Sequence, residues 1–473
     1  MAGAVAMNFI IKDTVHIPTL AVKGDISDPL SVESLDQLES GSKIRYGDRN
    51  YRASKAGDLI ELAGPLRGSY WAVFVGRDGR ASRIGSKDIG DSYILFADGE
   101  WQAVNLTHPK NSNIKELKEI IVVSEHSGLD SGFNIISPDE NIYSSTPGQL
   151  LCVAENSLEL IDEVSQNPGK EEARAWLYQK KNIFSVRDLA NLPDFSSSII
   201  MGRQGGYLFT NDLGKFEVLE NKICYGNNNG GNYIQDVAGV MLNPPAASIM
   251  DLYYDALHYI EGGEKVMVLF LDGFGYHQYT YSIENGYAPF LGSMQPAEMA
   301  SSVYKPTTSS GLAAMITGKP PFENGVYSRK QRKIMTNSIF SKLMDLGKES
   351  LVVEGDIKFL DFEIEPVLNT DRNGNGTTDD EIFKYALENM MRGYDFVMVH
   401  FHSIDDSGHN YGDLDEKTME SITVVDSYVK KLLDNWGGKT IILSDHGMHS
   451  TNSGGDHGTF RHEDLVVPYI LLN

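Results

Sequence analysis

Aspartate and histidine residues in the C-terminal half of the sequence stand repeatedly at the ends of short apolar runs. Asp272 follows the unbroken run Val266–Leu271, and the adjacent residues Asp445 and His446 follow a second run, TIILS. Runs of this length suit strands that are buried on both faces. The carboxyl ends of such strands are where open α/β sheets bind ligands. Carboxylates and imidazoles without cysteine suit catalytic zinc, with manganese as the alternative, so the pattern predicts a metal centre.

Two further stretches supply residues of the same kinds. In HSIDDSGHNYG, Asp405 and His409 are four residues apart, a spacing that puts two side chains on one face of a helical turn. The stretch GGDHGTFRHED adds His457 and His462 before the last predicted strand. A single aspartate or histidine at a strand end is usually a cap or a core residue. Four such places in one half of the chain favour the ligands of a metal centre.

The stretch KPTTSSGLAAMITGKPP places two threonines at the start of a predicted helix. Pro306 precedes them, and GLAAMI continues with helical composition. Backbone N–H groups and the helix dipole at Thr307 and Thr308 would favour a bound anion. The alternative is that the two threonines simply cap the helix.

A polar stretch, NTDRNGNGTTDDEIF, has the side-chain order of a calcium-binding loop. Its candidate calcium ligands are Asp371, Asn373, Asn375, Thr377 and Asp379. Ile382 stands at the twelfth position, where such a loop has glutamate. The alternative to calcium is an Asx-rich turn that caps a helix over residues 379–392.

Strands and helices alternate from residue 265 onward, which predicts an α/β fold with a doubly wound, mostly parallel sheet. The predicted buried strands are Val266–Leu271, Ser350–Val353, Phe396–Phe401, Thr440–Leu443 and Val466–Leu472. The candidate ligands all stand at the carboxyl ends of these strands or just before a returning strand. This sheet must therefore position the site.

Residues 8 to about 125 predict a different kind of structure, a β-rich α+β region, and the signals weaken from about 130 to 235. Predicted strands lie in NFIIKDT, TLAVKG, YWAVFVGRDGRASRI, YILFADGEWQAV and KEIIVVSE, and predicted helices in SVESLDQLES and KAGDLIELAG. The Asn- and Gly-rich loop YGNNNGGNYIQD is the best boundary before the C-terminal half. We therefore expect a β-rich accessory domain over residues 1–128, a second accessory segment over 129–235 and a further domain over 236–473.

Composition excludes some classes of function. The net charge of −24 argues against nucleic-acid binding, which needs a basic face. Two cysteines cannot build a disulfide framework, and no apolar run approaches the ~20 residues of a transmembrane helix. The opening MAGAVAM lacks the basic segment of a signal peptide, so the compartment stays open. If that stretch replaces a signal peptide, an extracytoplasmic location is favoured.

Five motifs occur in the order LDGFG, PTTSSGLAAMITG, DDSGHNYG, SDHGM and GGDHG. Together they resemble the alkaline phosphatase superfamily, and most closely its nucleotide pyrophosphatase/phosphodiesterase-like branch. The resemblance covers roughly residues 240 to 473. It implies an alkaline-phosphatase-type sheet and a catalytic domain that hydrolyses phosphate-ester or nucleotide substrates with two zinc ions.

The resemblance also implies a role for each candidate residue. One zinc would be held by Asp272, Thr308, Asp445 and His446, and the other by Asp405, His409 and His457. His457 is preferred to His462 because it stands in the G-D-H-G motif. Thr308 would be the nucleophile, because it stands nine residues before the threonine of the closing T-G, and would form a phospho-threonine intermediate.

The chain departs from that branch at its phosphate-binding residues. Gly311 stands where the branch carries an asparagine, and a second such asparagine falls near Arg329. Arg329, Lys330 and Arg332 form a basic cluster that could grip phosphate, or could be a solvated turn. The leading hypothesis is a phosphodiesterase or nucleotide pyrophosphatase. The alternatives are a phosphomonoesterase of the same superfamily and a binding protein with a vestigial catalytic domain.

The N-terminal region resembles, through KGDISDPLSVESLDQL and the GRDGR turn, the molybdopterin-binding domain of sulfite-oxidase-like proteins. That family holds its molybdenum through a cysteine, and residues 1–151 contain none. The resemblance therefore implies a domain without the cofactor. The later stretch FSVRDLANLPDFSSSIIMGRQGGYLF repeats features of the first domain, with GRQGG in place of GRDGR, which predicts a degenerate internal repeat.

Overall fold

A computed structural model describes residues 17–34, 37, 42–125, 132–165, 174–226, 233–361 and 363–472 of the chain. The described residues form two compact units. One unit comprises those within Met1–Gly132, Ser145–Phe184 and Glu217–Lys222, and the other those within Phe133–Ser144, Ser185–Phe216 and Ile223–Asn473. Among the described residues, no helix is both long and apolar enough to cross a membrane.

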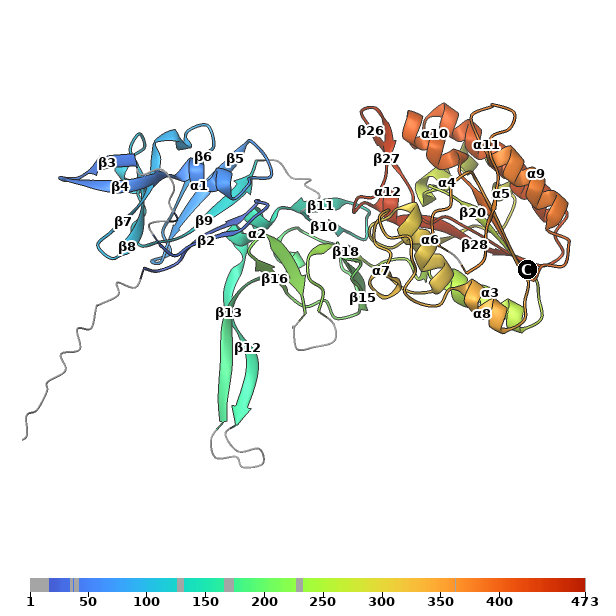
Figure 1. The fold of residues 1–473 in the computed structure, drawn as a ribbon, viewed down its shortest axis with the longest axis horizontal. Coiled ribbons are helices and arrows are strands. Elements are labelled where there is room, and N and C mark those ends of the chain that lie inside the picture. The colour runs from blue at the N-terminus through green and yellow to red at the C-terminus, as the bar shows by residue number, and fades with distance from the viewer. Residues whose placement is uncertain are drawn as a thin grey trace, which may run out of the picture. The chain divides into compact units, whose positions relative to one another are not determined.

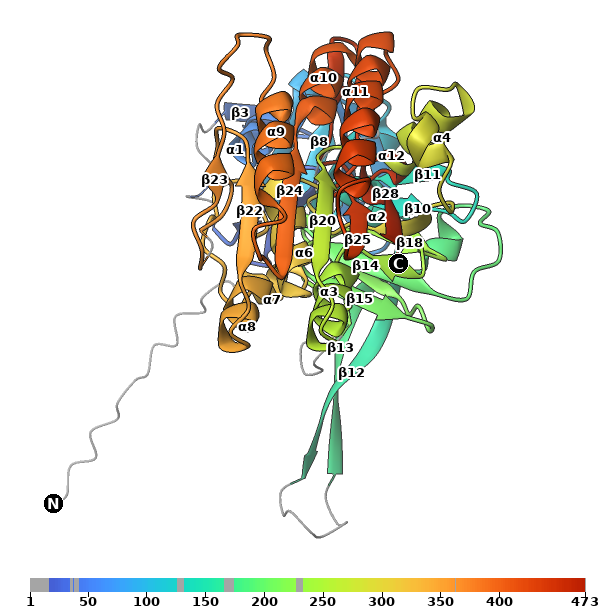
Figure 2. The same ribbon diagram turned by 90° about the vertical axis from the view of Figure 1, so that its right-hand side faces the viewer.

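The second unit is built on a mixed, mostly parallel sheet, which has eight strands within the described residues. In spatial order the strands are β19 (Ala247–Ser248), β21 (Glu298–Ser301), β28 (Val466–Leu472), β25 (Lys439–Leu443), β20 (Val266–Leu271), β24 (Phe396–Phe401), β22 (Ser350–Glu354) and β23 (Val367–Leu368). Figure 2 shows the last six of these strands side by side. Strand β28 runs antiparallel to both of its neighbours, and the other pairs are parallel.

Helices cover both faces of this sheet (Figure 1). They are α3 (Asp251–Glu261), α4 (Tyr276–Glu284), α5 (Pro289–Gly292), α6 (Thr308–Thr317), α7 (Pro321–Asn324), α8 (Ile339–Asp345), α9 (Asp379–Asn389), α10 (Ser403–Tyr411), α11 (Glu416–Leu433) and α12 (His462–Leu465). Helices α3, α6 and α8 share one buried apolar cluster with the sheet, and α9 and α11 share a second. The sheet is therefore the middle layer of three.

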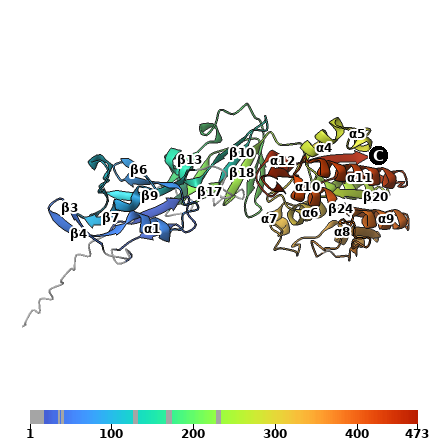
Figure 3. The same ribbon diagram turned by 90° about the horizontal axis from the view of Figure 1, so that it is seen from above.

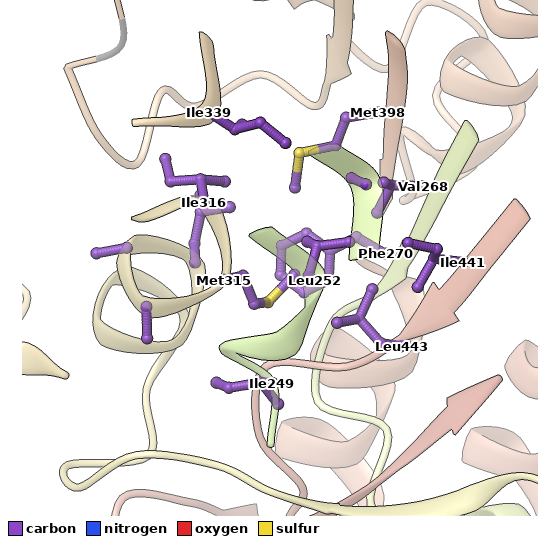
Figure 4. Close-up of a cluster of buried hydrophobic side chains, with 14 of the residues drawn as sticks. Ile249, Leu252, Val268, Phe270, Met315, Ile316, Ile339, Met398, Ile441 and Leu443 are labelled. Atoms are coloured by element: carbon purple, nitrogen blue, oxygen red, sulfur yellow. The ribbon is translucent and has the colours of Figure 1, made fainter. Parts of the chain in front are cut away.

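Strand β20 shows why the sheet needs both helical layers. Its residues alternate between the two apolar clusters, and all six are buried. Val268 and Phe270 face the cluster that contains Leu252 of α3 and Met315 of α6 (Figure 4). A strand without a polar face is stable only when both faces are covered, which is the usual state of parallel sheets. The predicted α/β fold and all five predicted strands are confirmed.

The first unit is β-rich, as predicted. A five-stranded sheet has the order β2 (Leu30–Val32), β1 (Leu20–Gly24), β9 (Leu117–Ser124), β5 (Tyr70–Gly76) and β6 (Ala81–Gly85). A second sheet has the order β3 (Ser42–Tyr46), β4 (Arg49–Lys55), β7 (Ser92–Ala97) and β8 (Glu100–Asn105), of which β3, β4 and β7 are labelled in Figure 3. The unit also contains α1 (Ala56–Leu62), α2 (Pro147–Val153) and a long hairpin of β12 (Glu155–Ser165) and β13 (Arg174–Phe184), which Figure 1 shows.

Three local predictions in this unit have different outcomes. The predicted strand NFIIKDT lies outside the described residues. The helix predicted in SVESLDQLES does not begin at Ser31, because Ser31 and Val32 belong to strand β2 and pair with β1. Pairing with a neighbouring strand overrides the local helical pattern there. The helix predicted in KAGDLIELAG is confirmed as α1.

The second unit contains a further five-stranded sheet, ordered β11 (Ile142–Ser145), β10 (Phe133–Ile136), β18 (Val237–Leu242), β14 (Ser198–Gly202) and β15 (Tyr207–Thr210). This order matches that of the β2-β1-β9-β5-β6 sheet. In both sheets the second and third strands are parallel and the fourth is antiparallel to the third. The turns GRDGR and GRQGG place Gly79 and Gly205 at equivalent positions with φ of 82° and 79°. These matches favour the predicted repeat, while the boundaries at residues 128 and 235 stay a prediction.

Asp25 is expected to be a structural carboxylate of the first unit. It is fully buried, and it accepts hydrogen bonds from Ser124 N at 2.6 Å and Gly148 N at 2.8 Å. Asp25→Ala should lower the free energy of unfolding by about 2 kcal/mol or more, because each orphaned buried N–H costs about 1–3 kcal/mol. Urea unfolding measures this change. Asp28→Ala, at an exposed position, is the control and should change stability by less than about 0.5 kcal/mol; equal effects of the two substitutions would contradict the assignment.

Candidate metal centre

The carboxyl edge of the large sheet brings the predicted ligands together. Asp272 directly follows β20, and Asp445 and His446 follow β25. Helix α10, which begins just after β24, carries Asp405 on its first turn, and helix α6 begins with Thr308. Strands β25 and β24 flank β20 in parallel, so their carboxyl ends meet at one place. The five residues therefore come from separate chain segments that the sheet aligns.

The first group of side chains surrounds Thr308. Its Oγ1 lies 3.5 Å from Asp272 Oδ1 and 3.5 Å from His446 Nε2. His446 Nε2 lies 3.5 Å from Asp272 Oδ1 and 3.3 Å from Asp445 Oδ2. Ligand atoms on one tetrahedral zinc, each about 2.0–2.1 Å from the ion, are separated by about 3.4 Å. The spacing of this group is that of a tetrahedral coordination shell.

The second group gathers around Asp405. Its Oδ2 lies 3.4 Å from His409 Nε2, and its Oδ1 lies 3.7 Å from His457 Nε2. The ring of His457 stacks on that of His446, with centroids 3.8 Å apart. The ligand atoms of Asp405, His446 and His457 lie within 4.8 Å of one another, so the two groups adjoin. Side chains of both groups can therefore face one bound phosphate group.

Backbone carbonyls fix the tautomers of the three histidines. Nδ1 of His409 lies 3.2 Å from Gly455 O, Nδ1 of His446 lies 3.0 Å from Gly447 O, and Nδ1 of His457 lies 3.0 Å from Pro306 O. A carbonyl only accepts, so each Nδ1 carries a proton, and Nε2 is the nitrogen that has a lone pair when the ring is neutral. Metal-binding histidines are oriented in this way. The Nε2 atoms of all three histidines therefore face the two groups and are the nitrogens that can bind a metal.

The carboxylates carry a surplus of negative charge. Asp405 Oδ1 and Asp445 Oδ2 are buried and have no hydrogen-bond partner among the described residues. Burial raises the pKa of the Asp445 carboxyl well above its ordinary value, and the charges of Asp272 and Asp405 raise it further. Orphaned buried oxygens of this kind are costly unless a cation faces them. The residues therefore fit a pair of divalent metal ions.

Two histidines of the second group differ in their protonation. Burial lowers the pKa of His457 to about 4, so its imidazole is neutral at pH 7. The contact with Asp405 raises the pKa of His409 to about 9. Because a histidine must be neutral to bind a metal, metal binding would displace a proton from His409 at pH 7 but none from His457.

Two glycines allow the elements to approach closely. Gly273 has φ of 70°, and a Cβ there would lie 2.7 Å from Asp405 Oδ1. The backbone that follows Asp272, a member of the first group, therefore also lies against Asp405 of the second group. A Cβ at Gly311 would lie 2.6 Å from Asp445 Cβ. A side chain at position 311 would collide with Asp445, so the glycine allows helix α6 to approach the first group closely.

A cleft of about 640 Å³ opens over both groups. Thr308, Ser309, Arg329, Arg332 and Lys358 are among the residues that line it. Arg329 Nη2 lies 3.3 Å from His457 Nε2, so its guanidinium reaches the edge of the second group. Lys330 is exposed and lies outside the lining of this cleft. The basic cluster predicted from sequence is thus divided between the cleft and the surface.

The structure separates the two candidate histidines. His457 lies beside Asp405 and His446, whereas His462 begins helix α12 and lies 3.8 Å from Glu140. The preference for His457 agrees with this placement.

The predicted calcium loop has a different pattern of contacts from a cation site. The Asp371 carboxylate accepts hydrogen bonds from the N–H groups of Gly374, Asn375 and Gly376. Asn373 and Asn375 donate their side-chain amides to Asp380. The buried Asp379 accepts from the backbone N–H groups of His402 and Ser403, and Thr377 accepts from Asp379 N. This pattern is the one expected for the alternative interpretation, an Asx turn before helix α9. The calcium site stays a prediction, and these hydrogen bonds give it no support.

Sequence reasoning missed three residues next to the first group. Glu354 ends strand β22, His400 lies within β24 and His402 follows it. All three are buried, and His400 Nε2 lies 3.2 Å from Asp272 Oδ2. The sequence signal that could have revealed the two histidines is H-F-H at the end of an apolar run. Residues two apart on a strand share a face, so this pattern predicts that the two imidazoles lie side by side.

Residues 358–468 match the protein family described as Type I phosphodiesterase / nucleotide pyrophosphatase. This match supports the predicted resemblance of the C-terminal region to the nucleotide pyrophosphatase/phosphodiesterase-like branch of the alkaline phosphatase superfamily. The matched segment contains Asp405, His409, Asp445, His446 and His457, whereas Asp272 and Thr308 precede it. No curated protein matches the chain significantly. The comparisons give no support to the molybdopterin-domain resemblance, which stays a prediction.

Solved structures of such enzymes show weak similarity. Murine ectonucleotide pyrophosphatase/phosphodiesterase 5 is 18% identical, with a TM-score of 0.33 over 40% of this chain and 58% of that one. Its human counterpart is 15% identical, with a TM-score of 0.32 over 40% and 58%. Phosphonoacetate hydrolase from Sinorhizobium meliloti, in complex with phosphonoformate, is 14% identical, with a TM-score of 0.33 over 39% and 56%. The chain thus spans less than two thirds of each relative, and similarities this low carry no conclusion about activity.

His457→Ala is expected to lower the number of metal ions bound per chain by one, because the substitution removes Nε2 from the group around Asp405. Inductively coupled plasma mass spectrometry of protein purified without chelators measures this number. His462→Ala is the matched control and should leave the number unchanged. A loss in the His462 variant with full binding in the His457 variant would show that the wrong histidine was chosen.

Proposed function

We propose that the C-terminal region is a two-zinc phosphoric ester hydrolase that acts through a phospho-threonine intermediate on Thr308, with manganese as the alternative metal. The observation that carries this proposal is the gathering of three tautomer-fixed histidines and three carboxylates into two adjoining groups, one of which contains the Thr308 hydroxyl, 3.5 Å from Asp272 and from His446. The family match of residues 358–468 supports a phosphodiesterase-type reaction. A binding protein with a vestigial site would not need this intact set.

The residues of the site would have different roles in the reaction. A bound metal pair would favour the alkoxide of Thr308 and neutralise charge on the phosphate. Asp272 and His446 hold the hydroxyl of Thr308, which lines the cleft as the first residue of helix α6. The hydroxyl oxygen attacks phosphorus and its proton passes to solvent, the bond between phosphorus and the ester oxygen breaks, and the leaving group departs and takes up a proton from water. Water then cleaves the phospho-threonine and restores the hydroxyl.

Substrate charge separates the two candidate activities. A diester brings one negative charge to the metals, whereas a monoester brings two and needs further positive charge. The threonine nucleophile and the family match favour diesters or nucleotide anhydrides. Arg329, Arg332 and Lys358 in the cleft favour the second candidate, a phosphomonoesterase, because they add the charge that a dianion needs. We take the diesterase as the first proposal.

Thr308→Ala is expected to reduce turnover of both p-nitrophenyl phosphate and bis-p-nitrophenyl phosphate by at least about 10³-fold, since the substitution removes the nucleophile. Thr307→Ala is the matched control. The Thr307 hydroxyl lies 3.1 Å from Ser310 Oγ, and Thr307 is not among the residues that line the cleft, so its loss should leave most of the activity. Equal activities in the Thr308 variant and the unaltered protein would contradict the assignment of the nucleophile.

Arg329→Ala tests the class of substrate through kcat/KM for the two p-nitrophenyl esters. For a diesterase, the diester is hydrolysed faster, and the substitution changes the ratio of the two values by less than about 3-fold. Lys330→Ala is the control, because Lys330 carries the same charge outside the cleft. Faster monoester hydrolysis that is lost selectively in the Arg329 variant would replace the diesterase proposal with a phosphomonoesterase.

A further inference from the structure

A second cluster of metal-binding side chains lies directly behind Asp272. Glu354, His400 and Asp272 are 1%, 1% and 2% exposed, and His402 is 9% exposed. Glu354 Oε2 lies 2.9 Å from His400 Nδ1, and Glu354 Oε1 lies 2.6 Å from His402 Nε2. One buried carboxylate therefore faces one nitrogen of each of the two histidines.

This contact determines which nitrogens remain available. An ionised carboxylate only accepts hydrogen bonds, so His400 carries its proton on Nδ1 and His402 carries its proton on Nε2. The remaining nitrogens both face the same atom: His400 Nε2 lies 3.2 Å and His402 Nδ1 lies 3.6 Å from Asp272 Oδ2. Two imidazole lone pairs and a carboxylate oxygen repel one another unless a cation lies among them. That cation is either an added proton on an imidazole or a metal ion.

Geometry favours the metal ion. The distances of 3.2 and 3.6 Å bracket the separation of about 3.4 Å expected between ligand atoms on a tetrahedral zinc. The 3.2 Å distance also suits a hydrogen bond from His400 to Asp272, but 3.6 Å is too long for one from His402, so a proton would hold only one of the two nitrogens whereas a metal ion would hold both. Glu354 gives both histidines the carboxylate partner that orients metal-binding imidazoles. The arrangement repeats, with a carboxylate in place of carbonyls, the one found at His409, His446 and His457.

The surroundings hold the two rings rigidly and leave the cluster a route to solvent. The His400 ring stacks on Phe270, with centroids 3.7 Å apart and an angle of 10°. Phe359 stacks on His402 in the same way, at 5.9 Å and 20°. A Cβ at Gly355 would lie 3.0 Å from the His402 ring, so any larger residue would crowd the ring. Asp272 and His402 both line the cleft over the first two groups, which gives an ion a path inward.

We propose that Asp272 Oδ2, His400 Nε2 and His402 Nδ1 bind a third divalent metal ion, with Glu354 as the carboxylate that orients both histidines. Two nitrogens and one carboxylate oxygen suit zinc, cobalt or manganese better than calcium or magnesium. Asp272 would then bridge two ions, with Oδ1 toward Thr308 and Oδ2 toward the third ion. The third ion is a positioning device: it fixes the carboxylate that holds the nucleophile. The proposal rests on the proposed function only through Asp272.

The test is the number of metal ions bound by the full chain after equilibration with zinc and removal of free metal by gel filtration. The unaltered protein should hold three ions per chain, and His402→Ala should hold two. His449→Ala, which removes a buried histidine paired with Asp464, is the control and should keep three. Thermal unfolding of each variant checks that it is folded.

Glu354→Gln provides a second, nearly isosteric variant in case His402→Ala fails to fold. The amide donates where the carboxylate accepted, so one histidine must reverse its tautomer and turn an N–H toward Asp272. The variant should therefore also hold two ions. Two ions in the unaltered protein, unchanged in His402→Ala and Glu354→Gln, would overturn the third site and show that a proton holds the cluster. Loss of an ion in the His402 variant, with no loss in His457→Ala, would instead contradict the two-metal site while sustaining the third.

Discussion

Buried negative charge at one edge of the large sheet is the constraint on which the rest of the structure depends. Asp272, Glu354 and Asp445 are almost fully buried, and Asp405 adjoins them with a buried oxygen. Removing ionised carboxylates from water costs several kcal/mol each, and no lysine or arginine pairs with these four in the described part of the chain. Five histidines face them instead, each with one nitrogen held by a carbonyl or a carboxylate. The fold therefore places buried carboxylates and imidazoles where they can bind cations.

The sheet supplies the rigidity that such a scaffold needs. Strand β20 is buried on both faces, and its neighbours β24 and β25 run parallel to it, so three chain segments end together. Helices α6 and α10 then present Thr308 and Asp405 from their first turns. Gly273 and Gly311 remove the side chains that would hold these segments apart. Each of these features is required for packing, and together they bring the candidate metal ligands close to one another.

Much of this arrangement could be predicted from the sequence because apolar runs of strand length and their terminal polar residues are local patterns. The strands of the sheet, the start of helix α6 and the spacing of Asp405 and His409 all follow from such patterns. The cluster of Glu354, His400 and His402 could not be predicted in the same way, because its members become neighbours only through the pairing of β22 with β24 and of β24 with β20. The calcium prediction remains untested, and the contacts of its residues could likewise not be predicted from the side-chain order. The side-chain order was correct, but backbone N–H groups of distant and local residues occupy the carboxylates of Asp371 and Asp379.

Anomalous X-ray diffraction at the absorption edge of the bound metal tests the central claim most directly. Crystals of the protein purified without chelators should show one strong peak among Asp272, Thr308, Asp445 and His446, and another among Asp405, His409 and His457. Both peaks should weaken together when the crystals are soaked in a chelator. A well-ordered site without anomalous peaks, in protein that still hydrolyses phosphate esters, would contradict the account.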